Sequence, residues 1–206
     1  MIYTKQGDGG TSKTIKGFSQ PKDAPVFQAL GTLDELSAAL GVAKSEAGAT
    51  VRDTITVIQS ELLGVGEYVA GGRPFDFAAA ATRFETLIDA FENRMQREKA
   101  FVLSGKTKLG ALLDVARTVA RRAERSVVTL TKRYMLPPDI NPYLNRLSDL
   151  LYILARYADQ LGNAPERVQR TAEPAAVPNE MGLQCAERIC RAVLEKARAM
   201  DLRAVC

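Results

Sequence analysis

Apolar residues recur at steps of three and four along most of the first 161 residues, a spacing that places them on one face of an α-helix. The pattern predicts helices over residues 32–45, 51–69, 79–99, 108–132 and 142–161. No stretch shows the alternation of apolar and polar residues that is typical of a strand. Because the helices are long and most connections between them are short, the sequence predicts an all-α fold, an antiparallel five-helix bundle.

Capping residues mark two of the helix starts. Thr32 and Glu35 have the spacing of a capping box, so the first helix is predicted to begin at Thr32. This start places Asp34 in the first turn, where a carboxylate interacts favourably with the helix dipole. Residues 16–31, which contain two prolines, are then expected to form an irregular connector. Asn141 is predicted to cap the last helix of the bundle.

The composition changes after residue 161. Residues 162–180 contain three prolines and no apolar period, which indicates a linker. The helical period returns over residues 181–200. The expected organisation is therefore a bundle over residues 1–161, a linker over 162–180 and a C-terminal helical segment over 181–206.

The helix predicted over residues 108–132 carries the excess charge of the chain. It holds six basic and two acidic residues, a net charge of +4, and the whole chain is also +4. Arg117, Arg121 and Arg125 are four residues apart and therefore share one face, separate from the apolar face. Two interpretations remain open at this point: a site for an anion, or the solvated face of an amphipathic helix, which is the commoner origin of a charged run.

The composition narrows the chemistry that the chain can perform. The absence of histidine excludes histidine-based triads and histidine metal ligands. The three cysteines lie near the C-terminus without CxxC spacing, so they predict neither a disulfide framework nor a zinc site. No apolar run approaches the length of a membrane span, and the N-terminus lacks a signal-peptide core, so we expect a cytoplasmic protein with no membrane partner.

Residues 3–14 are rich in glycine, hydroxyl groups and lysine. Glycines let the backbone approach an anion closely, and successive N–H groups can form a nest for it. The spacing is not that of a Walker A loop. A flexible N-terminal segment is the alternative, although such a segment has no evident need for this cluster of hydroxyl groups and lysines.

A polar stripe lies beside the apolar seam of the last bundle helix. Its members are Asn145, Asp149, Tyr152 and Arg156. The stripe is either exposed to solvent or lines an interface or a ligand cleft.

Several motifs together resemble one family. They are Ile2-Tyr-Thr-Lys and Gly7-Asp-x-Gly, then Pro21-Lys-Asp, Gly31-Thr-Leu-Asp-Glu-Leu, Ala116-Arg-Thr-Val-Ala-Arg-Arg-Ala-Glu-Arg and Tyr143-Leu-Asn-Arg-Leu-Ser-Asp. Over residues 1–160 the chain resembles the PduO-type ATP:corrinoid adenosyltransferases. The arginine motif and the Asn-Arg-Leu-Ser-Asp motif are specific, and their order and spacing argue against a chance similarity.

The resemblance implies a homotrimer of five-helix bundles that binds ATP, with Mg²⁺ on its phosphates, and reduced cobalamin near the subunit interfaces. Co(I) of the corrinoid attacks the 5′ carbon of ATP, which gives adenosylcobalamin and triphosphate. This chemistry suits a chain without histidine, because Co(I) is the nucleophile and the protein has to align the reactants and stabilise the leaving group. The implied partners are a cobalamin reductase or flavoprotein electron donor and an adenosylcobalamin-dependent enzyme that accepts the product.

The resemblance also implies roles for single residues. The expected ATP contacts are Thr4, Lys5, Gln6, Gly7, Ser12, Lys13, Lys22, Arg121, Arg122, Glu124, Arg125 and Asn145. Arg121 is expected to be catalytic, together with Asp34 and Arg117, which would pair across a subunit boundary. Phe101 is expected to lie against the lower face of the corrin and keep a base away from cobalt. Core packing is the alternative for this phenylalanine.

The chain departs from the family pattern in three places. Lys22-Asp-Ala-Pro-Val-Phe replaces a common Lys-Asp-Asp-x-Arg-Val, Ser104-Gly-Lys replaces Pro-Gly-Gly, and Asp114 replaces a frequent histidine. The last two changes alter the turn and the charge on the corrinoid side. The segment 181–206 resembles the opening helix of an HbpS/GlcG-like domain, and a docked C-terminal helix is the alternative.

Two other functions are kept as alternatives. A basic helical module for nucleic acid is permitted by the isoelectric point of about 9.0 but disfavoured by the 6% aromatic content, so no nucleic-acid partner is expected. The other is an adenosylcobalamin chaperone or scaffold with weak catalysis.

Overall fold

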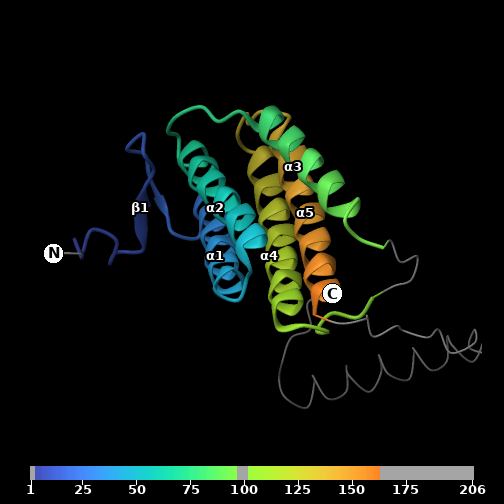
Figure 1. Ribbon diagram of the computed structural model, residues 1–206. Coiled ribbons are helices and arrows are strands. Elements are labelled where there is room, and N and C mark those ends of the chain that lie inside the picture. The colour runs from blue at the N-terminus through green and yellow to red at the C-terminus, as the bar shows by residue number, and fades with distance from the viewer. Residues whose placement is uncertain (1–2, 97–101, 163–206) are drawn as a thin grey trace, which may run out of the picture. The chain divides into compact units, whose positions relative to one another are not determined.

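The computed structural model describes residues 3–96 and 102–162. In this part of the chain the helices are α1 (Pro25–Ser45), α2 (Ala49–Val69), α3 (Phe77–Glu92), α4 (Lys108–Thr131) and α5 (Ile140–Leu161), and the strands are β1 (Thr11–Lys13) and β2 (Ser19–Pro21) (Figure 1). The predicted five-helix bundle is confirmed. Phe101, the last three residues of the helix predicted over 79–99, nearly all of the predicted linker and the whole segment 181–206 lie outside the described residues.

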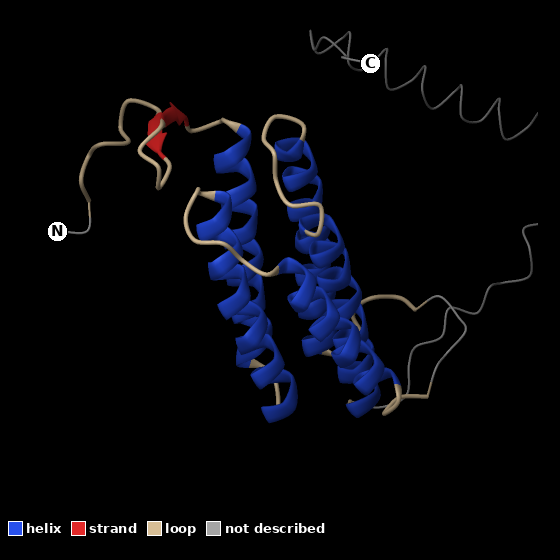
Figure 2. Ribbon diagram, turned by 90° about the horizontal axis from the view of Figure 1, so that it is seen from above, coloured by secondary structure: helices blue, strands red, loops and turns tan. Residues whose placement is uncertain are grey.

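The helices follow one another across the bundle in the order α2, α1, α4, α5, α3. α4 packs against both α1 and α5, α1 packs against α2, and α3 packs against α5. An ion pair between Arg83 of α3 and Glu61 of α2 joins the two outer helices. The helix that carries the arginines is therefore flanked by α1 on one side and α5 on the other (Figure 1). These two neighbours decide which of its side chains reach solvent. Figure 2 shows the helices from above, with the small pair of strands outside them.

The predicted start of the first helix is wrong. α1 begins at Pro25, with Ala24 in an extended conformation before it, so Thr32 is a buried residue inside the helix. Its hydroxyl donates a hydrogen bond to the carbonyl oxygen of Gln28 at 2.6 Å instead of capping a helix end. A proline at the first helical position lacks only an N–H that has no partner there, so Pro25 starts the helix instead of breaking it. Asp34 is consequently exposed in the middle of α1, and its predicted role at the helix dipole is also wrong.

Two other helix ends differ from the prediction. α3 ends at Glu92, and Met95, which extends its apolar line, packs against the core from the turn that follows. α5 begins at Ile140, so Asn141 lies inside the helix and Asp139 takes the N-cap position. Ile140 is fully buried, and its packing favours a helix that includes it. The predicted bounds of the helices over 51–69 and 108–132 agree with α2 and α4 within two residues.

The core lies between the five helices and contains one aromatic cluster. Tyr143 is fully buried and packs against the rings of Phe75, Phe77 and Phe84 at centroid distances of 5.7, 5.8 and 5.2 Å. Its hydroxyl makes no hydrogen bond with any of the described residues. Burial, with a further contribution from the negative charge of Glu61, raises the pKa of the Tyr143 phenol well above its ordinary value.

A small antiparallel hairpin, which the sequence pattern did not reveal, precedes α1. Thr11 pairs with Pro21 and Lys13 with Ser19. Three residues per strand are too few to show an alternation of apolar and polar positions. The N–H of Ile15 donates to the carbonyl oxygen of Ala70 at 3.0 Å and attaches the hairpin to the end of α2. The hairpin lies outside the bundle, on the side of α1 and α2 (Figure 1).

Candidate functional site

The start of α4 is fixed by its cap and by α5. The hydroxyl of Thr107 accepts the N–H of Gly110 at 3.0 Å and donates to the buried carboxylate of Asp159 at 2.8 Å. The apolar face of α4 is buried at Leu113, Ala116, Ala120, Ala123, Val127 and Leu130. This burial fixes the rotation of the helix and turns the arginine face toward the surface.

Only some of the α4 arginines have an internal partner. Arg122 forms an ion pair with Glu35 of α1, and Nε of Arg117 lies 3.4 Å from Oδ1 of Asp114 one turn earlier. Arg121 and Arg125 are exposed, and neither forms a hydrogen bond or ion pair within the described residues. Two guanidinium groups on one face are thus free to bind an anion, which charge-assisted hydrogen bonds would hold strongly.

The start of α5 brings a second set of polar side chains to the same face. Asn145 lies 3.5 Å from the carboxylate of Glu124, and its amide oxygen accepts a hydrogen bond from Arg146 at 2.9 Å. Hydrogen bonds to Glu85 and then Asp149 raise the pKa of the Arg146 guanidinium, so this group stays charged. Asn145 and Glu124, both expected at the nucleotide, therefore lie together in one chain.

A cleft of about 460 Å³ adjoins this face between α3, α4 and α5. Arg117 and Arg121 line it from α4, and Arg146 and Tyr152 line it from α5. The carboxylates of Glu85 and Asp89 line the opposite side from α3. The cleft thus combines cations at α4 and α5 with acidic side chains at α3.

The N-terminal loop collects the other predicted nucleotide contacts. Residues 5–10 form turns in which the N–H of Gly10 donates to the carbonyl oxygen of Gly7, and Lys5 has a positive φ of 58°. Lys22 packs over Gly7, where an added Cβ would lie 2.9 Å from its Nζ. Ser12 and Lys13 lie on β1, opposite β2. The hairpin therefore gathers residues that stand far apart in sequence, with Thr4 and Gln6 in the same loop.

The two sets of predicted contacts are not joined within one chain. In residues 3–96 and 102–162 no hydrogen bond or ion pair links the loop residues to Arg121, Arg125 or Asn145. Asp34 likewise has no ion-pair partner among them, and Arg117 turns to Asp114 instead. Asp34 and Arg117 form no ion pair within one chain, and their predicted pairing across a subunit boundary stays a prediction.

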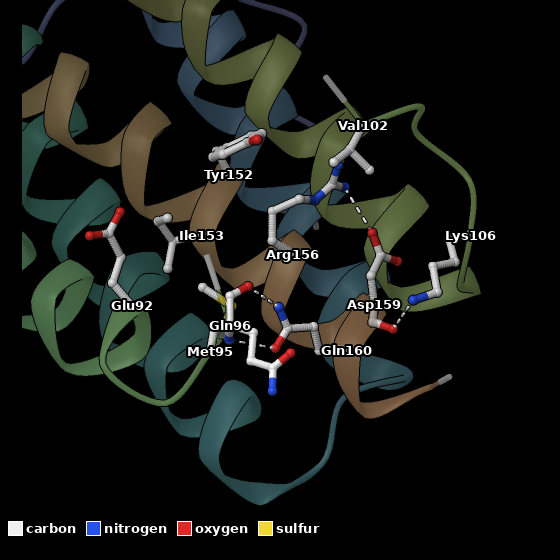
Figure 3. Close-up of a pocket in the computed structure, with 10 residues that line it drawn as sticks. All are labelled: Glu92, Met95, Gln96, Val102, Lys106, Tyr152, Ile153, Arg156, Asp159 and Gln160. Carbon is white, nitrogen blue, oxygen red and sulfur yellow. Dashed lines mark hydrogen bonds and ion pairs between the residues drawn. The ribbon is translucent and has the colours of Figure 1, made fainter. Parts of the chain in front are cut away.

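A second cavity, of about 260 Å³, lies between α3, the turn before α4 and α5 (Figure 3). Val102, which follows Phe101 in the sequence, lines it together with Tyr152 and Arg156 of the predicted polar stripe. Lys106 and Asp159 line the side next to α4, and a pair of glutamines, Gln96 and Gln160, bonds across the other side at 2.9 Å. The stripe on α5 therefore lines a cleft, one of the alternatives that the sequence left open.

Sequence reasoning missed the buried charges beside this cavity. Nη2 of Arg156 lies 2.6 Å from Asp114 and 3.1 Å from Asp159, and both carboxylates are almost fully buried. The signal was present, because an aspartate at position 114 falls within an apolar face and a charged side chain there requires a buried partner. Its partner stands 42 residues away and could not be chosen from the sequence.

Within the described ranges no group of three or more His, Cys, Asp or Glu side chains could hold a metal ion. None of the helices there is long and apolar enough to cross a bilayer.

The comparisons with known proteins agree with this geometry. The family model "Cobalamin adenosyltransferase" matches residues 2–158. The human corrinoid adenosyltransferase MMAB is 38% identical over 190 residues, which cover 85% of this chain and 75% of that protein. The corrinoid adenosyltransferase of Bacillus subtilis is 36% identical over 164 residues, with 75% of this chain and 84% of that protein covered.

Solved structures show the same fold. A variant PduO-type ATP:corrinoid adenosyltransferase from Lactobacillus reuteri, complexed with cobalamin and ATP, superposes with a TM-score of 0.77 at 31% identity and covers 83% of this chain and 97% of its own. Another variant of that enzyme, complexed with ATP, gives a TM-score of 0.74 at 33% identity and covers 78% and 95%. Because the family model spans most of the chain and the fold agrees, this protein belongs to the cobalamin adenosyltransferase family and is an ATP:corrinoid adenosyltransferase.

Proposed function

We propose that the active site of this adenosyltransferase is shared between two copies of the chain within a homotrimer. The α4 face of one copy, with Arg121, Arg125 and Asn145, would bind the triphosphate and sugar of ATP. The N-terminal loop of the next copy, with Lys22 and the residues around Gly7, would close over the nucleotide.

The reaction transfers the 5′-deoxyadenosyl group of ATP to the cobalt of cob(I)alamin. The Co–C5′ bond forms with the electron pair of Co(I) as the C5′–O5′ bond breaks, and triphosphate leaves. The leaving group is a polyanion, so free guanidinium groups on α4 lower the barrier where negative charge accumulates. Mg²⁺ would be held mainly by the phosphates of ATP, because the described residues offer no carboxylate cluster for it.

One observation carries the proposal of a shared site. Arg121 and Arg125 are exposed and unpaired among the described residues. The loop expected to complete the site is attached to the end of α2 and, through Gln20, to Tyr134 beyond the end of α4, and it makes no hydrogen bond or ion pair with either arginine. An anion on the α4 face of one copy therefore needs the loop of another copy to enclose it.

Asp34 supports the same arrangement. With α1 starting at Pro25, Asp34 has no capping role, and it stands exposed without a partner among the described residues of its own chain. Arg117 is only partly exposed and pairs with Asp114 at the long distance of 3.4 Å. We propose that Asp34 of one copy reaches Arg117 of the next, which would align α4 with the neighbouring loop.

The corrinoid would occupy the 260 Å³ cavity of Figure 3 and the adjoining cleft. Val102 in its wall directly follows Phe101, which we propose as the residue under the corrin. Tyr152 lines both the cavity and the cleft, so a large, flat ligand over Tyr152 would lie next to the α4 arginines. A reductase or flavoprotein would supply the electron that reduces Co(II) of the corrinoid to Co(I). An adenosylcobalamin-dependent enzyme would accept the product.

Complementation between two inactive variants tests the shared site. Lys22→Ala removes a loop contact, and Arg121→Ala removes a helix contact. When the two proteins are denatured, mixed and refolded, some mixed trimers contain an interface with both native halves. Anaerobic conversion of cob(I)alamin with ATP, followed by absorbance, should recover a substantial part of the wild-type rate.

Each variant refolded alone is the control, and its rate of cob(I)alamin conversion should stay low. If each site is contained within one chain, every site in the mixture carries a defect and mixing restores nothing, which would overturn the shared site. Absence of any conversion by folded, ATP-binding wild-type protein would overturn the proposed activity itself.

A further inference from the structure

Asp114 is a buried carboxylate that joins two arginines from different helices. Its Oδ2 accepts a hydrogen bond from Nη2 of Arg156 on α5 at 2.6 Å, and its Oδ1 accepts one from Nε of Arg117 on α4 at 3.4 Å. Only 5% of the Asp114 side chain is exposed. The two guanidinium groups therefore replace the water that a carboxylate binds in solution.

The two arginines line different hollows of the molecule. Arg156 lines the cavity of Figure 3, and Arg117 lines the adjoining cleft. Tyr152 lines both, and its ring lies 5.3 Å from the Arg156 guanidinium. Asp114 thus supports a wall of the cavity and a wall of the cleft at the same time.

A second carboxylate, that of Asp159, holds Arg156 and anchors the cluster. Nη2 of Arg156 lies 3.1 Å from Oδ2 of Asp159, and Oδ1 of Asp159 accepts hydrogen bonds from the N–H and the hydroxyl of Thr107 at 3.2 and 2.8 Å. The cluster pairs two carboxylates with two guanidinium groups, so its charges balance. It is fixed to the start of α4 and cannot shift without breaking these contacts.

Both arginines keep nitrogens that the cluster does not use. Nη1 of Arg156 and the two terminal nitrogens of Arg117 make no hydrogen bond within the described residues. Asp114 therefore holds each guanidinium at one nitrogen and leaves others for a group outside the cluster. An arginine whose nitrogens were all used internally could only support the fold.

We infer that Asp114 is a positioning residue for adenosyl transfer, which fixes Arg156 in the cavity and Arg117 in the cleft relative to each other and so aligns the corrinoid with the nucleotide. The inference rests on the proposed placement of the corrinoid in the cavity and of ATP on the α4 face. Transfer requires Co(I) and C5′ of ATP to approach to about 3–3.5 Å, and a misplacement of about 1 Å costs roughly 100-fold in rate. A support that both hollows share controls this approach.

The test measures kcat and KM of the full-length Asp114→Asn variant in the anaerobic assay, at saturating cob(I)alamin. The variant has the same size, but one acceptor oxygen becomes an NH₂ donor, so the side chain cannot accept a hydrogen bond from both arginines. We expect kcat per folded molecule to fall about 10- to 100-fold. KM for ATP should stay as in the wild type, because Arg121 and Arg125 make no hydrogen bond or ion pair with Asp114.

Glu61→Gln is the matched control. Glu61 is also a buried carboxylate paired with an arginine, Arg83, and it lines neither the cavity nor the cleft. Both variants remove the charge of a buried, paired carboxylate, so both should lower the unfolding temperature. If Asp114 is purely structural, both variants should keep the wild-type kcat per folded molecule, whereas positioning predicts that only Asp114→Asn is slow.

A second measurement does not require Asp114→Asn to fold. Arg117→Lys and Arg156→Lys each keep the positive charge beside Asp114, and their rates are measured singly and in the double variant. If one carboxylate aligns both side chains, the loss of either contact disturbs the same alignment. The double variant should then be about as slow as the slower single variant, whereas independent effects would multiply.

Three results would overturn the inference. One is a wild-type kcat in Asp114→Asn, and the second is an equal loss of kcat in Glu61→Gln. The third is a loss of rate in the two lysine variants that is absent or that multiplies in the double variant. Turnover by the wild type, and complementation between the Lys22 and Arg121 variants, test the proposed activity and the shared site without reference to Asp114.

Discussion

Replacement of Arg121 by alanine isolates the chemical role of the α4 face from its structural role. Arg121 is exposed and forms no hydrogen bond or ion pair within the described residues, so its loss breaks no such internal interaction. Exposed substitutions of this kind change the free energy of unfolding by about 0.5 kcal/mol or less. A hydrogen bond to a charged group is worth roughly 1.5–3 kcal/mol, so one lost contact to the leaving triphosphate should slow the reaction about 10- to 150-fold.

The assay is anaerobic conversion of chemically reduced cobalamin at saturating ATP, with thermal unfolding measured on the same samples. Arg133→Ala provides the control, because it removes an exposed arginine just beyond the end of α4. It should leave both the rate and the unfolding temperature unchanged. A normal rate for Arg121→Ala, or a loss of rate matched by a loss of stability, would refute the assignment of this arginine to the triphosphate.

Three further predictions concern the fold and the assembly. Gly110→Ala would place a Cβ 2.1 Å from Oδ1 of the buried Asp159, so we expect a loss of about 1–3 kcal/mol in denaturant unfolding, and wild-type stability would contradict this packing. Tyr143→Phe removes a buried hydroxyl that has no partner among the described residues, and it should be neutral or stabilising by up to about 1 kcal/mol near pH 7. Because the pKa of Tyr143 is raised in the folded state, the wild type should lose stability as the pH rises above about 10. The stability advantage of Tyr143→Phe in unfolding experiments should therefore grow above this pH. A difference in stability that stays constant with pH would contradict the raised pKa. Asp34→Asn should weaken the trimer in sedimentation experiments while the isolated chain stays folded, and an unchanged association constant would exclude the proposed pair with Arg117.

Helical periodicity, capping residues and helix-breaking residues predicted part of the fold, because these rules depend only on residues that are close in the sequence. α2 and α4 were placed correctly, because each has an unbroken apolar period and two glycines follow that of α2. The start of α1 was predicted wrongly, because Pro25 fits either a connector or the first turn of a helix, and Thr32 fits either a helix cap or a helix interior. Whether Thr32 caps a helix or lies inside one is decided by the burial of Val26 and Ala29 against the other helices.

The candidate site divides in the same way. The sequence by itself placed Arg117, Arg121 and Arg125 on one face, because their spacing matches the helical repeat. It could not decide which arginines are free, since the partner of Arg122 stands 87 residues away on α1. Only the tertiary structure left Arg121 and Arg125 unpaired among the described residues and joined Asp114 to Arg156 in the wall of a cavity, because packing between distant helices determines which charges meet.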